Sequence, residues 1–279
     1  FNKMNHWKIN NLSKRKEAKV LEVLAGHDEK DLTSSKIKVD EYSNFNKDIK
    51  GRKFAIIDEI YNSISDLTVK SEFNKILTKI KENGGIVERY SIDMNICKAI
   101  YPTYIVISCA ESTSNNACID GVKFGNREAG NSYEEIVINS RSKGFSKPIQ
   151  RRFIIGSYSL LKENQNDVFI RAQKCRRLIS NKINEILSQC DCIFMPSAPS
   201  IAPLFESVTN TLSDEYLLAD NYLCLANFNG SPSVSIPLGF ENGLPFGVNL
   251  ISKQFDEKNM LSIANTVESF TGLKNIIAK

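Results

Sequence analysis

The hydrophobic pattern of residues 53–90 predicts a strand, a helix and a second strand in that order. Residues 53–58, KFAIID, form a short apolar run that is typical of a buried strand. Asp66 then precedes a segment that Gly84 and Gly85 end, so we expect a helix with Asp66 as its N-cap. That segment has one apolar helical face, formed by Val69, Phe73, Ile76, Leu77 and Ile80. Residues 86–90 return to a strand pattern, and this β-α-β order favours an α/β sheet.

The same alternation continues toward the C-terminus. Residues 192–195 predict another strand, and Asp256 is expected to cap a last helix that ends before Gly272. Between the two β regions, Asp167 is expected to cap a second long helix. The apolar stripe of that helix consists of Val168, Ala172, Cys175, Ile179, Ile183 and Ile186. Since no repeat and no interior linker is visible, we expect one α/β domain over residues 20–279, after a poorly patterned segment, residues 1–19.

Residues 228–251, FNGSPSVSIPLGFENGLPFGVNLI, predict a β-hairpin. Seven of these 24 residues are Gly or Pro, yet apolar residues still alternate with others on both sides of Asn242 and Gly243. Asn and Gly tolerate the positive φ angles of a tight reversal, and alternation with period two is typical of half-buried strands. The pattern predicts local structure and indicates no chemistry.

Composition excludes several classes of function. The 279-residue chain is 42% hydrophobic, which is ample for a core, and its net charge of +4 is spread over short basic groups. Direct nucleic-acid binding is therefore disfavoured. Seven cysteines form no CxxC pair and only two histidines are present, so a zinc site is not expected and reduced, intracellular thiols are favoured. No apolar run reaches the length of a membrane span.

The few histidines also restrict the choice of nucleophile. A Ser-His-Asp triad would have to use His6, in the unpatterned N-terminal segment, or His27, where a solvent or capping role is favoured. A cysteine nucleophile needs a histidine as well. Serines such as Ser108, Ser231 and Ser233 lie in contexts that match ordinary strand or helix positions.

Eight short motifs occur in an order that resembles the amidase signature family. They are 21–31 LEVLAGHDEKD, 110–114 AESTS, 119–125 IDGVKFG, 141–145 RSKGF, 150–152 QRR, 195–199 MPSAP, 226–232 ANFNGSP and 255–258 FDEK. Within that family, the run is most similar to the glutamine-hydrolysing A subunits of tRNA-dependent amidotransferases. The resemblance covers residues 18–270, and its specificity comes from the agreement of many motifs in order and spacing.

This resemblance implies a mixed central sheet covered by helices, and an enzyme that releases ammonia from glutamine. The family uses a lysine and two serines, carried on a Gly/Ser-rich segment. Gly84-Gly85 is the only glycine pair here, and no such segment follows it. Because the chain also begins with Phe1 rather than Met, we expect the catalytic segment to precede it. The chain would then be the substrate-recognition half, truncated at its N-terminal side and inactive alone.

The resemblance also implies three residues that contact the substrate glutamine: Tyr104, Arg152 and Asp220. A free amino acid carries a carboxylate and an ammonium, and Arg152 and Asp220 would be their partners. Tyr104 would offer its hydroxyl near the side-chain amide. Without the resemblance, a surface arginine, a helix-capping aspartate and a core tyrosine are the favoured interpretations.

Partners follow from the same resemblance. We expect amidotransferase B and C subunits, with Glu-tRNA(Gln) contacted mainly through the B subunit, which would use ATP and Mg²⁺. No cofactor is expected in this chain, and no membrane. The expected compartment is the bacterial cytoplasm or the interior of an organelle. Two alternatives stay open: a stand-alone amidase of other specificity, which the pair Arg152 and Asp220 argues against, and a catalytically inactive interaction fragment.

Overall fold

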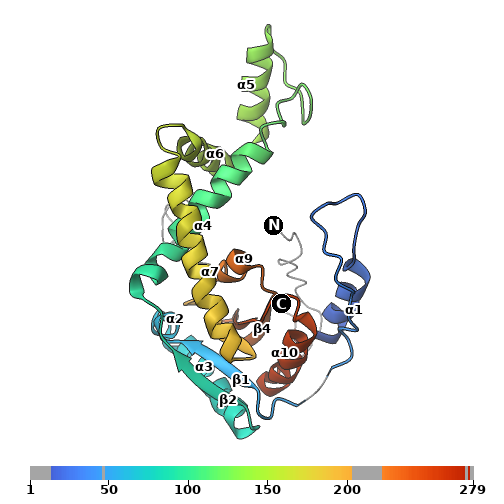
Figure 1. The fold of residues 1–279 in the computed structure, drawn as a ribbon, viewed down its shortest axis with the longest axis vertical. Coiled ribbons are helices and arrows are strands. Elements are labelled where there is room, and N and C mark those ends of the chain that lie inside the picture. Colours follow the sequence, from blue (N-terminus) through green and yellow to red (C-terminus); the bar gives the residue numbers. More distant parts are fainter. Residues whose placement is uncertain (1–13, 46–47, 203–221, 274–275, 277–279) are drawn as a thin grey trace. The chain divides into compact units, whose positions relative to one another are not determined.

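The computed structural model describes residues 14–45, 48–202, 222–273 and 276. The chain divides into two compact units (Figure 1). The first consists of residues 1–97 and 179–279, and the second of residues 98–178. The first unit contains the β-sheet with its covering helices, and the second is helical.

The sheet of the first unit is mixed and has five strands among the described residues, in the order β2-β1-β3-β5-β4. The strands are β1 (Lys53–Ile57), β2 (Ile86–Tyr90), β3 (Cys192–Pro196), β4 (Ser233–Glu241) and β5 (Leu244–Ile251). Strand β1 runs parallel to both β2 and β3, whereas β5 is antiparallel to β3 and β4. The mixed α/β architecture confirms the fold class expected from the sequence.

Helices α1 (Lys14–Leu24), α2 (Asp58–Asn62), α3 (Leu67–Glu82), α9 (Leu225–Asn229) and α10 (Glu257–Thr271) belong to the same unit. Asp66 caps α3 as expected, because its Oδ1 accepts hydrogen bonds from the amides of Thr68 (2.8 Å) and Val69 (3.0 Å). Asp256 is the N-cap residue of α10, but its carboxylate accepts from Asn259 Nδ2 instead of from the helix amides.

The expectation of an unpatterned segment up to residue 19 was wrong for residues 14–19, which are helical. Lys14 is buried, and its Nζ donates to the carboxylate of Glu17 and to the carbonyl oxygen of Ser235 (2.7 Å). Ala18 is fully buried on the same helix. The contact with Ser235 is long-range, so no local sequence pattern contains it.

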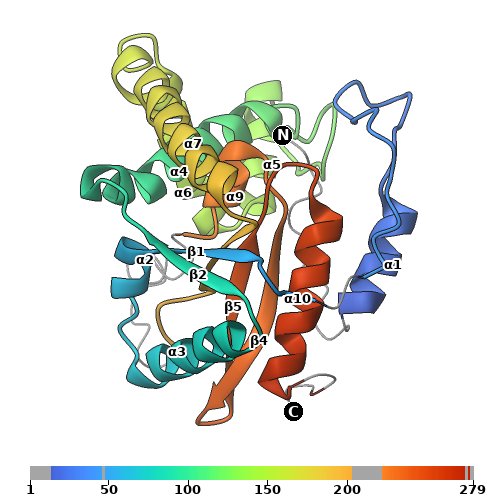
Figure 2. The same ribbon diagram turned by 60° about the horizontal axis from the view of Figure 1, so that its bottom comes forward.

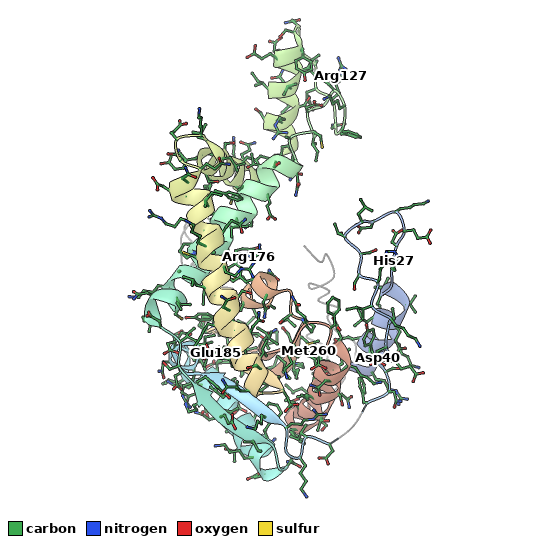
Figure 3. All side chains as sticks on the ribbon, viewed as in Figure 1. His27, Asp40, Arg127, Arg176, Glu185 and Met260 are labelled. Atoms are coloured by element: carbon green, nitrogen blue, oxygen red, sulfur yellow. The ribbon has the colours of Figure 1, made fainter. Side chains whose placement is uncertain are left out.

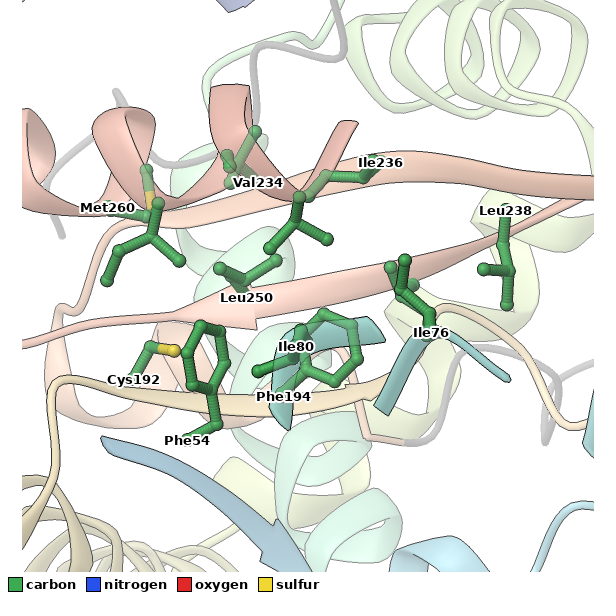
Figure 4. Close-up of a cluster of buried hydrophobic side chains, with 14 of the residues drawn as sticks. Phe54, Ile76, Ile80, Cys192, Phe194, Val234, Ile236, Leu238, Leu250 and Met260 are labelled. Carbon is green, nitrogen blue, oxygen red and sulfur yellow. The ribbon is translucent and has the colours of Figure 1, made fainter. Parts of the chain in front are cut away.

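The core of the first unit lies between one face of the sheet and helices α3 and α10 (Figures 2 and 4). Phe194 of β3 lies at its centre: its ring stacks on Phe73 of α3 at 5.4 Å and meets Phe54 of β1 edge-on at 6.1 Å. The hairpin contributes alternate residues, Val234, Ile236, Leu238, Phe246, Val248 and Leu250. Asn242 (φ 51°) and Gly243 (φ 78°) make the reversal, as the sequence predicted.

The helical unit contains α5 (Tyr133–Gly144) and α6 (Lys147–Leu160), and it shares α4 (Met94–Asn115) and α7 (Arg171–Gln189) with the first unit. The expected cap at Asp167 was wrong. Residues Asn166–Ile170 form a π-helical turn before α7, and the Asp167 carboxylate lies 3.6 Å from Arg171. The predicted stripe of α7 is buried at Ala172, Ile179, Ile183 and Ile186, and half-buried at Val168 and Cys175.

Candidate substrate-recognition site

Arg152 lies on α6, on the side of that helix that faces α4. The two helices approach closely at Gly156, where a Cβ would lie 2.2 Å from the carbonyl oxygen of Cys109. Thr113 Oγ1 of α4 also donates to the carbonyl oxygen of Phe153 at 3.3 Å. Because Gly156 has no side chain, α6 can approach α4 closely, and this determines the distance between Arg152 and α4.

The environment of Arg152 suits a ligand-binding cation. The residue is half-buried, and no carboxylate of the described residues forms an ion pair with it. The positive charge of Arg152 also affects the thiol of Cys109. Burial raises the pKa of this thiol, and the charge of Arg152 lowers it. A half-buried guanidinium without an anion is unfavourable, and an anionic ligand group would remove that cost.

Tyr104 is half-buried on a different face of α4. It lies five residues from Cys109, which is about 140° around an α-helix. Within the described part of the chain, no hydrogen bond joins Tyr104 to Arg152. Asp220 lies outside the described residues. The structure therefore does not test whether the three predicted residues lie together, and their binding roles stay predictions.

Glu111 shares the face of Tyr104 and was not singled out from the sequence. It follows Tyr104 by seven residues, two turns of α4. Burial raises the pKa of Glu111, and the positive charge of Arg176, which Figure 3 labels on α7, acts in the opposite direction. The seven-residue spacing from Tyr104 was the only signal that could have identified it. A half-buried carboxylate and a phenol on one helix face are groups that can recognise an ammonium or an amide.

The segment 226–232 contains the end of α9 and the turn that leads into β4. Asn229 is buried, and its Nδ2 donates to Asn184 Oδ1 on α7 at 3.0 Å, while its Oδ1 accepts from the amide of Ser231 at 3.2 Å. Gly230 has φ 72°, which only glycine adopts readily. The turn is thus fixed by one buried amide side chain.

Polar side chains of the hairpin are engaged in structural hydrogen bonds. Ser233 Oγ donates to Asn249 Oδ1 (3.0 Å), and Asn249 Nδ2 donates to Ser235 Oγ (3.3 Å). Ser108 Oγ donates within α4 to the carbonyl oxygen of Ile105 at 3.3 Å. No lysine takes part in these contacts. They agree with the structural interpretation of these serines.

His27 also has a local role. Its Nδ1 lies 2.8 Å from Ser34 Oγ, which in turn donates to the carbonyl oxygens of Asp28 and Asp31. His27, Asp28 and Asp31 are exposed and Ser34 is half-buried, and the contacts join residues of one loop. They do not form a triad, because no carboxylate of the described residues orients the imidazole.

Among the described residues, no group of three or more His, Cys, Asp and Glu side chains could hold a metal ion. In that same part of the chain, none of the helices combines the length and the hydrophobicity that a membrane span requires. All seven cysteines carry free thiols, and burial raises the pKa of Cys190 to about 12.

Comparison with known proteins gives one family. The family model described as Amidase matches residues 15–261. A Thermotoga maritima protein named as the A subunit of glutamyl-tRNA(Gln) amidotransferase is 36% identical over 254 residues, or 91% of this chain and 53% of that protein. A Wolbachia pipientis protein of the same name is also 36% identical, over 91% of this chain and 52% of that protein.

Solved structures of amidase-type proteins are also similar to this chain. The crystal structure of the Thermotoga maritima protein matches with a TM-score of 0.71 and 32% identity, over 92% of this chain and 51% of that chain. A bacterial aryl acylamidase of the amidase signature family matches with a TM-score of 0.70 and 18% identity, over 92% of this chain and 51% of that chain, which concerns the fold alone. The chain thus spans about half the length of the relatives it matches.

Proposed function

Because this chain belongs to the amidase family, we propose that it is the substrate-recognition part of the glutamine-hydrolysing subunit of a tRNA-dependent amidotransferase. The proposal rests on 36% identity, over nine-tenths of the chain, to proteins named as the A subunit of glutamyl-tRNA(Gln) amidotransferase. The proposed reaction releases ammonia from glutamine, and the ammonia converts Glu-tRNA(Gln) to Gln-tRNA(Gln).

In this proposal Arg152 binds the α-carboxylate of glutamine. Its half-buried guanidinium has no carboxylate partner among the described residues, which supports the assignment. A guanidinium can donate two parallel hydrogen bonds to a carboxylate. This pairing compensates the charge of the ligand and also fixes its orientation. Asp220 would bind the ammonium, and Tyr104 would position the side-chain amide.

Hydrolysis itself needs a nucleophile, a group that moves its proton, and donors for the oxyanion. We assign these, as a lysine and two serines, to the half of the relatives' length that this chain does not match. Partner B and C subunits complete the proposed complex, and the B subunit uses ATP and Mg²⁺ to activate Glu-tRNA(Gln). This chain alone is expected to hydrolyse no glutamine.

The test compares two ammonia sources in the complete enzyme with its partner subunits. Arg152→Ala, Arg152→Lys and Asp220→Ala should each weaken glutamine-driven amidation, since losing one partner of a buried charge pair costs about 2 to 5 kcal/mol. Amidation driven by free ammonia bypasses the pocket and should survive. The matched control is Arg151→Ala, which removes an exposed guanidinium from the neighbouring residue of α6 and should leave both activities unchanged.

Two outcomes would count against the assignment. A parallel loss of glutamine-driven and ammonia-driven activity in the Arg152 variants would mean that the residue supports the fold or an interface with a partner. Equal effects of Arg151→Ala and Arg152→Ala would mean that general positive charge on α6 matters, and not one recognition residue.

A further inference from the structure

The helical unit is strongly basic, although the whole chain is not. Residues 98–178 contain 13 Lys and Arg side chains and seven Asp and Glu side chains, a net charge of +6. The rest of the chain contains 23 basic and 25 acidic side chains, a net charge of −2. The small total of +4 disfavoured direct nucleic-acid binding for the chain as a whole, and that argument does not apply to the helical unit.

Within the unit, the positive charge is concentrated in its second part. Residues 98–140 contain three basic and five acidic side chains, whereas residues 141–178 contain ten basic and two acidic ones. Around α5, acidic side chains offset the basic ones, and Lys143 pairs with Glu128 at 2.9 Å. Residues 171–178, RAQKCRRL, at the start of α7, contain four basic side chains and no acidic one. The excess positive charge is therefore greatest on α7.

Three of these four side chains lie on the exposed side of α7. Ala172 is buried and Arg176 is half-buried on the side that packs within the protein. Arg171, Lys174 and Arg177 are exposed. Their spacing of three residues places them within about 120° around the helix and along about 9 Å of its axis. We call these three residues the α7 basic face.

Little negative charge of the chain itself compensates the α7 basic face. Arg171 lies 3.6 Å from the carboxylate of Asp167, and both side chains are largely exposed. A surface pair of this kind contributes little. Lys174 and Arg177 form no ion pair with a carboxylate of the described residues. The face is therefore available to an anion outside the chain.

A row of basic side chains along one helix attracts a polyanion, and nucleic acid is the polyanion for which such a row is typical. The proposed function brings one RNA to the enzyme, Glu-tRNA(Gln). We propose that the α7 basic face contacts the phosphate backbone of this RNA, in addition to the contacts expected through the B subunit. This inference rests on the proposed function. It concerns affinity and not the base sequence, because phosphate contacts carry no sequence information.

The test measures the Kd of labelled tRNA(Gln) for the complete enzyme, with its partner subunits, at several salt concentrations. The double variant Lys174→Glu with Arg177→Glu should raise the Kd on the order of tenfold. Its log Kd should also rise less steeply with log salt, by about 1 to 2, because each phosphate contact contributes about 0.7 to 0.9 to that slope. The matched control is Arg15→Glu with Lys19→Glu, which reverses one arginine and one lysine that are exposed on α1. It should leave the Kd and the slope unchanged.

A neutral double variant, Lys174→Gln with Arg177→Gln, keeps the test decisive if the charge reversal disturbs folding or assembly. It should raise the Kd about threefold and reduce the salt slope in the same way. Equal Kd values for the unaltered enzyme and the neutral variant would overturn the proposal. So would reduced co-purification of the B subunit with the neutral variant, because the α7 basic face would then bind a protein and not RNA.

Amidation assays distinguish failure of this inference from failure of the proposed function. Amidation with the same KM for Glu-tRNA(Gln) in the neutral variant and the unaltered enzyme would overturn the inference and leave the proposed function in place. Binding of tRNA(Gln) through the α7 basic face without any amidation would contradict the proposed function and support the inference. A complete enzyme that binds no tRNA(Gln) would contradict both.

Discussion

Arg52 and Asp191 form a salt bridge of 2.8 Å beside the first residues of two neighbouring parallel strands. The same carboxylate accepts the backbone amide of Lys53 at 2.8 Å, and the backbone amide of Asp191 donates to the carbonyl oxygen of Lys53 at 2.9 Å. Strands β1 and β3 pair in register through only Phe54↔Cys192 and Ala55↔Ile193. Asp191 therefore stabilises the pairing of β1 with β3 at the first residues of the two strands.

We expect Asp191→Ala to destabilise the chain by about 1 to 3 kcal/mol, because a backbone donor and a guanidinium both lose their acceptor. Urea unfolding measures the change. Asp167→Ala is the control: it removes an exposed carboxylate 3.6 Å from Arg171 on the surface of the helical unit, and such pairs contribute about 0 to 1 kcal/mol. If both substitutions cost the same, Asp191 is an ordinary surface charge.

A second prediction concerns the contact between α4 and α6. Gly156→Ala would place a Cβ 2.2 Å from the carbonyl oxygen of Cys109, which is backbone and cannot rotate away. We expect a loss of about 1 to 3 kcal/mol from overpacking.

The control for this change is Gly144→Ala at the end of α5, where an added Cβ meets no atom within 4 Å. That substitution should stabilise the chain by about 0.4 to 1 kcal/mol, because alanine restricts the unfolded chain more than glycine does. Thermal unfolding followed by circular dichroism distinguishes the two. Stabilisation by Gly156→Ala would show that α6 does not pack against Cys109 as described.

Local patterns predicted the sheet of the first unit well. The strand at residues 53–57, the Asp66 cap and the hairpin turn at Asn242 and Gly243 all depend on residues close together in the sequence. The helical start at Lys14 depends on Ser235, which is 221 residues away. No window of sequence contains such a contact, so the periodicity near Lys14 gave no signal.

The helical unit and the candidate site were harder to predict. Gly156 weakens the helical pattern of α6 in the sequence, yet in the structure it allows close packing on α4. Arg152 and Tyr104 were proposed from family resemblance alone, because a half-buried arginine or tyrosine has no distinctive pattern of its own. Glu111 was missed since its burial results from the packing of the helical unit.

A third prediction concerns the hydrogen bond between the buried side chain of Asn229 and the exposed side chain of Asn184. Asn229→Ala removes the donor to Asn184 Oδ1 and the acceptor for the amide of Ser231. We expect a loss of about 0.5 to 1.5 kcal/mol, since Asn229 loses its hydrogen bonds while the amide of Ser231 keeps its bond to the carbonyl oxygen of Ala226. Urea unfolding of both single variants and the double variant gives the coupling energy of the pair. If the two losses simply add, the hydrogen bond between the two amides makes no contribution.

The last prediction concerns pH. Burial raises the pKa of Glu257, in the first turn of α10, above its ordinary value of 4.5, and the negative charge of Asp256 acts in the same direction. The folded chain therefore binds this proton more tightly than the unfolded chain. It follows that the contribution of Glu257 to stability decreases as pH rises from 4.5 through the raised pKa.

Glu257→Gln removes the ionisable group, so the substitution should be more favourable at about pH 7.5 than at about pH 5. Urea unfolding at the two pH values measures this difference directly. The exposed Glu82→Gln on α3 removes the same charge from a helix at the surface and serves as the control. If Glu257→Gln and Glu82→Gln change stability by the same amount at both pH values, the difference comes from net charge and not from the burial of Glu257.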